Sequence, residues 1–250
     1  MHEPRRTALV DTSAFRLSLT ADVVHVSLKS GARTPKLIAI RRKPSLSRDQ
    51  HWRQRQIEAM PTIARLVRDG QLTLADSTEL SLEEIKGTYV GVSGITGDLF
   101  RDVRWKHVPA AIERSKFQQI DMDSYTRKGT VIAFCKILLG LDSREVAARP
   151  RFLQRFTDFE QENLRSLDRF RLICAGLNEN HYPDALHLWT AEVNGLDYFL
   201  TADRRFTNAM TKTSRVSLTT RLVSPVDLLA EVGVTGVDPM PIADDNIRPL

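Results

Sequence analysis

The chain alternates short apolar runs with longer segments of helical periodicity, and this alternation limits its fold more than any other feature. One run covers residues 7–10 and another residues 198–201, and an aspartate follows each within two positions, Asp11 and Asp203. Parallel strands need a crossover between them, usually a helix. Strands that alternate with helices therefore predict an α/β fold with a mostly parallel sheet covered on both faces.

Other elements follow from the same patterns. Further strands are predicted at residues 72–74 and 222–223, and alternating apolar residues predict a hairpin within residues 21–41. Apolar residues at helical spacing predict helices over residues 54–68, 80–85, 110–117, 131–141, 158–177, 184–192 and 225–232. A polar loop is expected between Asp203 and the last strand.

These elements define one expected domain, residues 1–232. It has two insertions, at about residues 21–53 and 90–124, and an irregular acidic tail at residues 233–250. The hydrophobic content of 42% is enough for a packed core. No stretch has the roughly 20 apolar residues that a membrane-spanning helix needs, and residues 1–6 lack a signal-peptide pattern. We therefore expect a cytoplasmic protein without membrane contact.

The chain has two cysteines, Cys135 and Cys174, which lie far apart in the sequence. Such a pair provides neither a disulfide framework nor a four-cysteine zinc site. Two buried free thiols are therefore expected.

Positive charge is concentrated in one stretch of the chain. The net charge is +5 and the pI is about 9.4. Between residues 29 and 55 a single acid, Asp49, faces nine basic side chains. We predict nucleic-acid contacts at four of these, because phosphates attract such a surface: Arg41, Arg42, Lys43 and Arg53. A solvated arm is the other interpretation, and Trp52 offers a surface on which a base can stack.

Four acidic residues are placed where a parallel sheet carries its functional site, at the carboxyl ends of its strands. Asp11 and Asp203 follow strands. Asp184 opens the helix before the second of these strands, and Glu84 lies on a helix directly after another strand. Carboxylates gathered in one cleft repel one another unless cations neutralise them, and an all-oxygen site suits Mg²⁺ or Mn²⁺. The four are therefore predicted to be catalytic and to bind metal.

Each of these residues also has an ordinary explanation. The three aspartates are in positions that cap helices or organise turns. Glu84 shares its helix with Glu79 and Glu83, and the sequence does not decide which of the three faces the site. Ser13 and Thr201 are predicted to support the site through hydroxyl hydrogen bonds, although hydroxyls near strand ends often bond only local backbone.

Taken in order, these pieces resemble the PIN domain family, which includes the VapC-like ribonucleases. Residues 11–14 resemble the family's first metal-binding aspartate with its adjoining hydroxyl, and Glu84 followed by Ile85 resembles its helical glutamate. Residues 184–191 are similar to the third acidic motif and residues 201–204 to the fourth. The resemblance is dense at both ends of the expected domain and absent from much of its middle.

The resemblance implies a Rossmann-like sheet, a metal-dependent endoribonuclease activity and, often, a homodimer. Asp11, Asp184 and Asp203 would then hold an ion directly, and Glu84 would bind a second ion or orient water. RNA is the implied substrate, with DNA as a second option. A toxin role within a toxin–antitoxin pair would add an antitoxin protein as partner, by family analogy alone.

Other interpretations remain beside this one. His187 lies on the helix face of Asp184, but we predict a structural role for it, because a metal-bound water needs no histidine base. The rival function is a catalytically inactive PIN-like module that binds RNA or a protein, and the presence of all four carboxylates argues against it. A phosphatase of the haloacid dehalogenase type would need a second aspartate where this chain has Ser13.

Overall fold

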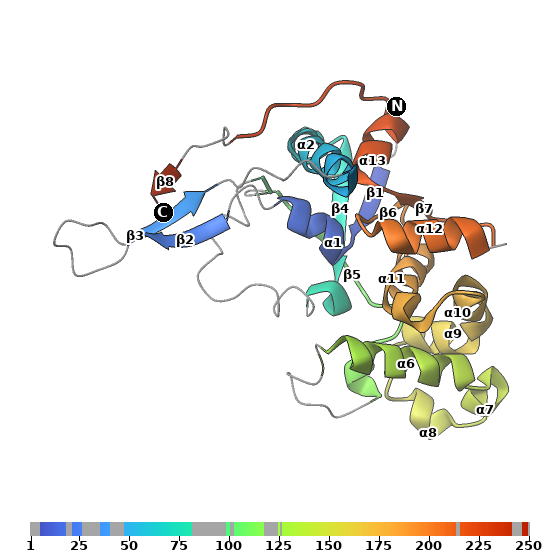
Figure 1. Ribbon diagram of the computed structural model, residues 1–250. Coiled ribbons are helices and arrows are strands. Elements are labelled where there is room, and N and C mark those ends of the chain that lie inside the picture. Colours follow the sequence, from blue (N-terminus) through green and yellow to red (C-terminus); the bar gives the residue numbers. More distant parts are fainter. Residues whose placement is uncertain are drawn as a thin grey trace.

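The structure, a computed structural model, describes residues 6–18, 22–26, 36–40, 48–81, 99–100, 103–117, 125, 127–213, 216–241 and 247–249 (Figure 1). Its main sheet has five strands, all parallel, in the order β5-β4-β1-β6-β7. The strands are β1 (Arg6–Val10), β4 (Leu72–Ser77), β5 (Lys106–Val108), β6 (Tyr198–Leu200) and β7 (Arg221–Val223). The predicted α/β class with a parallel sheet is confirmed, and the arrangement is compatible with a Rossmann-like fold.

Strand β1 lies at the centre of the sheet. Leu9 is opposite Ala75 of β4 on one side and Phe199 of β6 on the other, and its side chain is fully buried. Just beyond the end of β1, the Asp11 amide donates to the Leu200 carbonyl at 2.9 Å. The segments that follow β1 and β6 therefore leave the sheet side by side.

Helices cover both faces of the sheet (Figure 1). One face packs against α2 (Arg48–Arg68) and α13 (Pro225–Glu231), and alternate β1 residues such as Ala8 and Val10 join that core. The other face packs against a layer of five helices. These are α6 (Lys128–Gly140), α9 (Asp158–Arg165), α10 (Leu167–Cys174), α11 (Tyr182–Val193) and α12 (Arg204–Thr213). Four predicted helices are thus confirmed, in α2, α6, α11 and α13.

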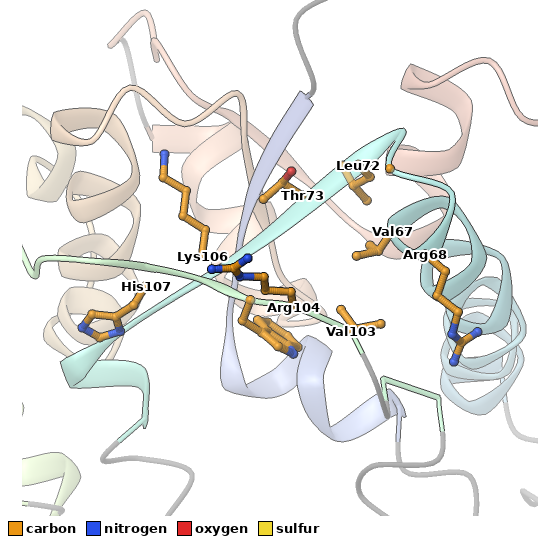
Figure 2. Close-up of a pocket in the computed structure, with 10 residues that line it drawn as sticks. Val67, Arg68, Leu72, Thr73, Val103, Arg104, Lys106 and His107 are labelled. Carbon is orange, nitrogen blue, oxygen red and sulfur yellow. The ribbon is translucent and has the colours of Figure 1, made fainter.

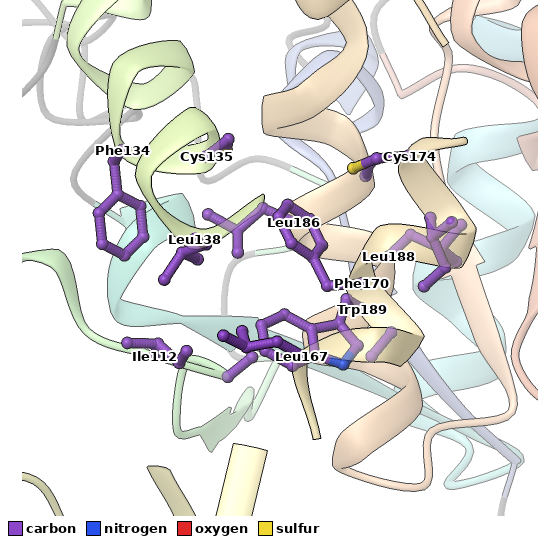
Figure 3. Packing of buried hydrophobic residues seen from close by; sticks show 14 of the residues in the cluster. Ile112, Phe134, Cys135, Leu138, Leu167, Phe170, Cys174, Leu186, Leu188 and Trp189 are labelled. Carbon is purple, nitrogen blue, oxygen red and sulfur yellow. The ribbon is translucent and has the colours of Figure 1, made fainter. Parts of the chain in front are cut away.

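The larger hydrophobic core lies on the α6–α11 side of the sheet (Figure 3). Trp189 of α11 stacks on Phe170 of α10 with ring centroids 5.1 Å apart. Cys135 and Cys174 are buried in the same core as free thiols, as predicted. Burial raises the pKa of both thiols, that of Cys174 to about 12, so they act here as apolar packing groups.

A second sheet has three antiparallel strands, β2 (Asp22–Val26), β3 (Lys36–Ile40) and β8 (Ile247–Pro249). Strands β2 and β3 form the hairpin that the sequence predicts, with Val24 opposite Ile38. The tail, however, is not irregular throughout, because its last residues pair with β3 as β8. A three-residue strand has no pattern of its own, since only its partner supplies the hydrogen bonds.

The single helix predicted over residues 158–177 is wrong, because α9 and α10 are separate. Ser166 between them has φ −113° and ψ 33°, outside the helical region. The apolar pattern continues through this break because both helices pack on the same core.

Two predictions near other helices are also wrong. The expected polar loop after Asp203 is α12, which buries Phe206 and Met210 beneath an otherwise polar surface. Those two apolar positions, four residues apart, were too few to mark a helix in the sequence. Conversely, the helix expected over residues 110–117 is reduced to the 3-10 turn η2 (Arg114–Lys116).

Both predicted insertions contribute to the ordered elements. From residues 90–124, β5 joins the edge of the main sheet beside β4. From residues 21–53, the last part forms the start of α2. The remaining short elements are α1 (Thr12–Phe15), η1 (Arg16–Ser18), α7 (Ser143–Ala147), α8 (Pro150–Leu153) and η3 (Glu179–His181). None of the helices in the described ranges combines the length and the apolar character that crossing a membrane requires.

Candidate active site

Asp11 sits at the carboxyl end of β1, where the chain turns into α1. It is the N-cap of α1, and its side chain is only 4% exposed. The Ser13 amide donates to Asp11 Oδ2 at 3.3 Å, and the Ser13 hydroxyl donates to the same oxygen. Asp11 is therefore a helix cap, as the ordinary explanation expects. Its carboxylate is also buried at the edge of the sheet where parallel α/β proteins bind ligands.

Hydroxyl groups join Asp11 to the segment that follows β6. The Thr201 hydroxyl donates to Asp11 Oδ2 at 2.8 Å, and the Asp203 amide donates back to Thr201 Oγ1 at 3.1 Å. The Ala202 amide donates to Ser13 Oγ at 2.9 Å. Ser13 and Thr201 thus make the supporting hydrogen bonds expected from the sequence, and they fix the two strand ends relative to each other.

Asp203 begins α12. Its Oδ1 accepts from the amides of Arg205 at 2.8 Å and Phe206 at 3.0 Å. These bonds satisfy two of the amides that the first turn of a helix leaves without partners. Asp203 therefore does organise a helix start, and its backbone amide bonds the same Thr201 hydroxyl that donates to Asp11.

Asp184 reaches the same region from α11. It is the third residue of that helix, whose N-cap is His181, and its side chain is 17% exposed. Burial and the nearby charges of Asp11 and Asp203 together raise the pKa of Asp184 to about 8, while His187 and Lys128 oppose the rise. The structure therefore brings the three aspartates from separate elements into one electrostatic neighbourhood.

The three aspartates offer oxygen donors only, which is the donor set that Mg²⁺ and Mn²⁺ prefer. Burial first, and then the charges of Asp11 and Asp203, raise the pKa of Asp184, and a bound cation would offset both effects because it stabilises the charged carboxylate. Among the described residues, no group of three or more histidine, cysteine, aspartate or glutamate side chains is arranged so that it could hold a metal ion, and this includes the three aspartates. Glu84, the predicted fourth ligand, lies outside the described residues, as does Glu83. The three aspartates supply the oxygen donors that a divalent ion prefers, but the described side chains alone do not complete a site for it.

Glu79 does not take the place of Glu84. It is 3% exposed, and its carboxylate accepts from the guanidinium of Arg114 at 2.5 Å and from the Tyr125 hydroxyl at 2.8 Å. The Arg114 guanidinium also lies over the Tyr125 ring, 4.1 Å from its centroid. Glu79 is therefore committed to a buried ion pair, which is a structural role.

Two residues near the aspartates were not predicted from the sequence. Lys128, the first residue of α6, is close enough to lower the pKa of Asp184. Ser77 ends β4 beside β1, and its buried hydroxyl has no hydrogen-bond partner within the described ranges. Neither belongs to a recognisable motif, because only the packing of α6 and β4 brings them here. His187 is 2% exposed within α11 and is close enough to lower the pKa of Asp184, so its structural role stays a prediction.

The predicted nucleic-acid residues are only partly described. Arg41, Arg42 and Lys43 lie outside the described residues, and Arg53 is exposed on α2. Nearby, a cavity of about 670 Å³, here called the α2–α12 pocket, opens between the start of α2 and the start of α12. Its basic and aromatic lining consists of Arg48, His51, Trp52, Arg55 and Arg204.

A second basic cavity, of about 580 Å³, lies along the first half of β4 and is here called the β4-edge pocket (Figure 2). Figure 2 shows Arg104 and Lys106 over that strand, with Arg68 on the α2 side. Leu72 and Thr73, which line it, are the first residues of β4, whereas Asp11 follows the last residue of β1. Lys106 and His107 of β5, which also line it, are opposite Ala75 and Asp76 of β4, so this pocket follows the β4–β5 edge of the sheet.

The chain has no match among family models, curated proteins or solved structures. The comparisons therefore assign it neither a family nor an activity. What the chain does must be inferred from the residues of its site and from their arrangement.

Proposed function

We propose that this chain is a divalent-metal-dependent endoribonuclease of the PIN type. The observation that carries the proposal is the approach of three aspartates from separate elements at the carboxyl edge of a parallel sheet: Asp11 after β1, Asp184 on α11 and Asp203 after β6. Parallel α/β proteins place their sites at this edge. The short motifs around these aspartates resemble those of the PIN family, which adds the choice of reaction and of RNA as substrate.

The chain's own residues have separate tasks in this proposal. Asp11, Asp184 and Asp203 hold the ion, with Glu84 as the proposed further carboxylate. The Thr201 and Ser13 hydroxyls hold one oxygen of Asp11 in place, which leaves its orientation fixed before an ion binds. A bound Mg²⁺ or Mn²⁺ supplies a water of lowered pKa and positive charge for the phosphodiester oxygens.

The choice of aspartate at these three positions also favours a catalytic role over simple helix capping. Asparagine caps a helix as well as aspartate does, and it would avoid both the burial of a charge and the repulsion from Asp11 and Asp203, which together raise the pKa of Asp184. Three aspartates kept close together therefore lower the stability of the protein without its cation, as expected of a functional site. A non-catalytic RNA-binding or protein-binding module, the alternative function, gains nothing from this repulsion.

Partners beyond the nucleic acid rest on the family resemblance alone. An antitoxin protein and a homodimer belong to that part of the proposal, and DNA remains the second substrate to test. Co-purification of the chain with the product of a neighbouring gene would support the toxin–antitoxin role.

The direct test compares cleavage of labelled single-stranded RNA and DNA by the purified protein, with Mn²⁺ and with chelator. We expect internal cleavage of RNA that depends on Mn²⁺ and is lost in the Asp11→Asn variant. Asp142→Asn is the matched control, because Asp142 also caps a helix, α7, but on the exposed surface. Cleavage that persists in chelator, or that survives Asp11→Asn, would contradict the proposal.

A further inference from the structure

We propose that the α2–α12 pocket is a binding subsite for a single-stranded segment of the nucleic acid, and that it guides the strand to the aspartates. This inference rests on the proposed function for its substrate, but the pocket itself is defined by its own geometry. Its volume of about 670 Å³ lies within the range of natural ligand pockets. That is enough room for at least one nucleotide.

The pocket is directly connected to the aspartate site. Arg204 lines the pocket and is the residue after Asp203, so their Cα atoms are about 3.8 Å apart across the peptide bond. The Asp203 carboxylate caps the same helix, α12, of which Arg204 is the first residue. A strand that contacts Arg204 in the pocket would therefore lie one residue away from Asp203 along the chain.

The charge of the pocket suits a phosphodiester backbone. Three arginines, Arg48, Arg55 and Arg204, line it together with a single acid, Glu58. The Glu58 carboxylate accepts a hydrogen bond from Gln54 at 2.7 Å and keeps its charge, so the lining has three positive groups against one negative group. Arginine binds phosphate through paired N–H groups, and three arginines from two helices around one cavity match a chain of phosphates better than a single small anion.

Trp52 is the residue of the pocket that can stack with a base, whereas the arginines bind phosphate. Of the three tryptophans, Trp189 is buried against Phe170, and Trp105 packs edge-on against two phenylalanines. Trp52 is half-buried in the pocket wall, and within the described part of the chain it makes no contact with another aromatic ring. An indole face beside arginines provides a stacking platform for a base. Only an unpaired base can use such a platform, so the pocket favours a single strand over a duplex.

The test measures binding in the presence of chelator, so that it does not depend on cleavage. The probe is a fluorescein-labelled oligouridylate of about ten nucleotides, followed by anisotropy across a range of salt concentrations. We expect Trp52→Ala to weaken binding about tenfold or more and Trp52→Phe to retain most of the affinity. Arg55→Ala should lower the log–log salt slope by about one. Arg104→Ala, in the β4-edge pocket, removes the same charge elsewhere and should change neither value.

A second measurement guards against misfolding of the alanine variant. Oligouridylate should quench the tryptophan fluorescence of the wild-type protein through stacking on Trp52. The quenching should disappear in Trp52→Phe, a variant that retains an aromatic ring and about the same packing.

The outcomes separate this inference from the proposed function. If Trp52→Ala and Arg55→Ala bind the probe as tightly as the wild type, the pocket is not a subsite, even if the protein cleaves RNA. If binding depends on both residues but Mn²⁺ produces no cleavage, the subsite stands and the nuclease proposal fails. Equal affinity for a duplex of the same length, with the same dependence on Trp52, would also overturn the inference.

Discussion

Replacement of Asp184 by asparagine should stabilise the metal-free protein at neutral and alkaline pH. Burial, together with the charges of Asp11 and Asp203, raises the pKa of Asp184 from 3.8 to about 8 in the folded state. Between these two values the folded protein keeps a proton that the unfolded chain has released. Stability therefore falls as the pH rises through this window, and the full loss is present above about pH 8.

The size of this effect follows from the width of the window. At roughly 1.4 kcal/mol for each pH unit, the loss by pH 8 is on the order of 5 kcal/mol. Asparagine keeps the shape of the side chain and removes the charge, but its amide must find its own hydrogen bonds. We therefore expect the variant to exceed the wild type by at least about 2 kcal/mol near pH 8, and by less than about 1 kcal/mol near pH 4.

Urea unfolding followed by tryptophan fluorescence in chelator, near pH 4 and near pH 8, measures this difference. Added Mn²⁺ should stabilise the wild type more than Asp184→Asn near pH 8, because the cation offsets the same repulsion. Asp142→Asn controls for the change of side chain, since Asp142 accepts from the Arg144 amide at 2.8 Å in an exposed cap. If Asp184→Asn is no more stable than the wild type near pH 8 in chelator, the reasoning is refuted.

Three further results are expected from other parts of the molecule. Glu79→Gln should lower the free energy of unfolding in urea by roughly 3–5 kcal/mol, because it leaves Arg114 buried without its charged partner. Cleavage per folded molecule should be unchanged. If stability and cleavage both fall, Glu79 belongs to the site. Replacement of Arg41, Arg42 and Lys43 by alanine should lower the salt slope of RNA binding by up to about three, and an unchanged slope would leave the segment as a solvated arm. The two buried cysteines should react with a thiol reagent only on unfolding, because burial raises the pKa of both, and rapid labelling of the native protein would disprove this.

The sequence predicted those parts of the fold whose signals are local. Buried parallel strands are short apolar runs, so β1 and β6 were evident, and the aspartates that follow them could be assigned to one edge of the sheet. Helices with several apolar positions at helical spacing, such as α6 and α11, could also be predicted, because that spacing is a local signal. The three aspartates at that edge could therefore be selected from the sequence, whereas their role as a metal site stays a prediction and Glu84 lies outside the described residues.

The parts that the sequence did not predict depend on contacts between distant residues. Strand β5 has only three residues, and its pairing with β4 defines it. Helix α12 buries only Phe206 and Met210 and starts from the Asp203 cap. The pocket could not be predicted either, because nothing in the sequence places Arg204 in one cavity with Trp52. Secondary structure of this kind follows from tertiary packing rather than from local propensity.

The most direct test of the nuclease proposal is the cleavage rate of Asp203→Asn on single-stranded RNA in Mn²⁺. Asparagine preserves the cap that Asp203 provides to Arg205 and Phe206, so the stability should change by less than about 1 kcal/mol. The loss of one negative charge from the site should reduce cleavage by at least roughly a hundredfold. Wild-type cleavage by a folded Asp203→Asn variant would remove Asp203 from the site and contradict the metal-dependent mechanism.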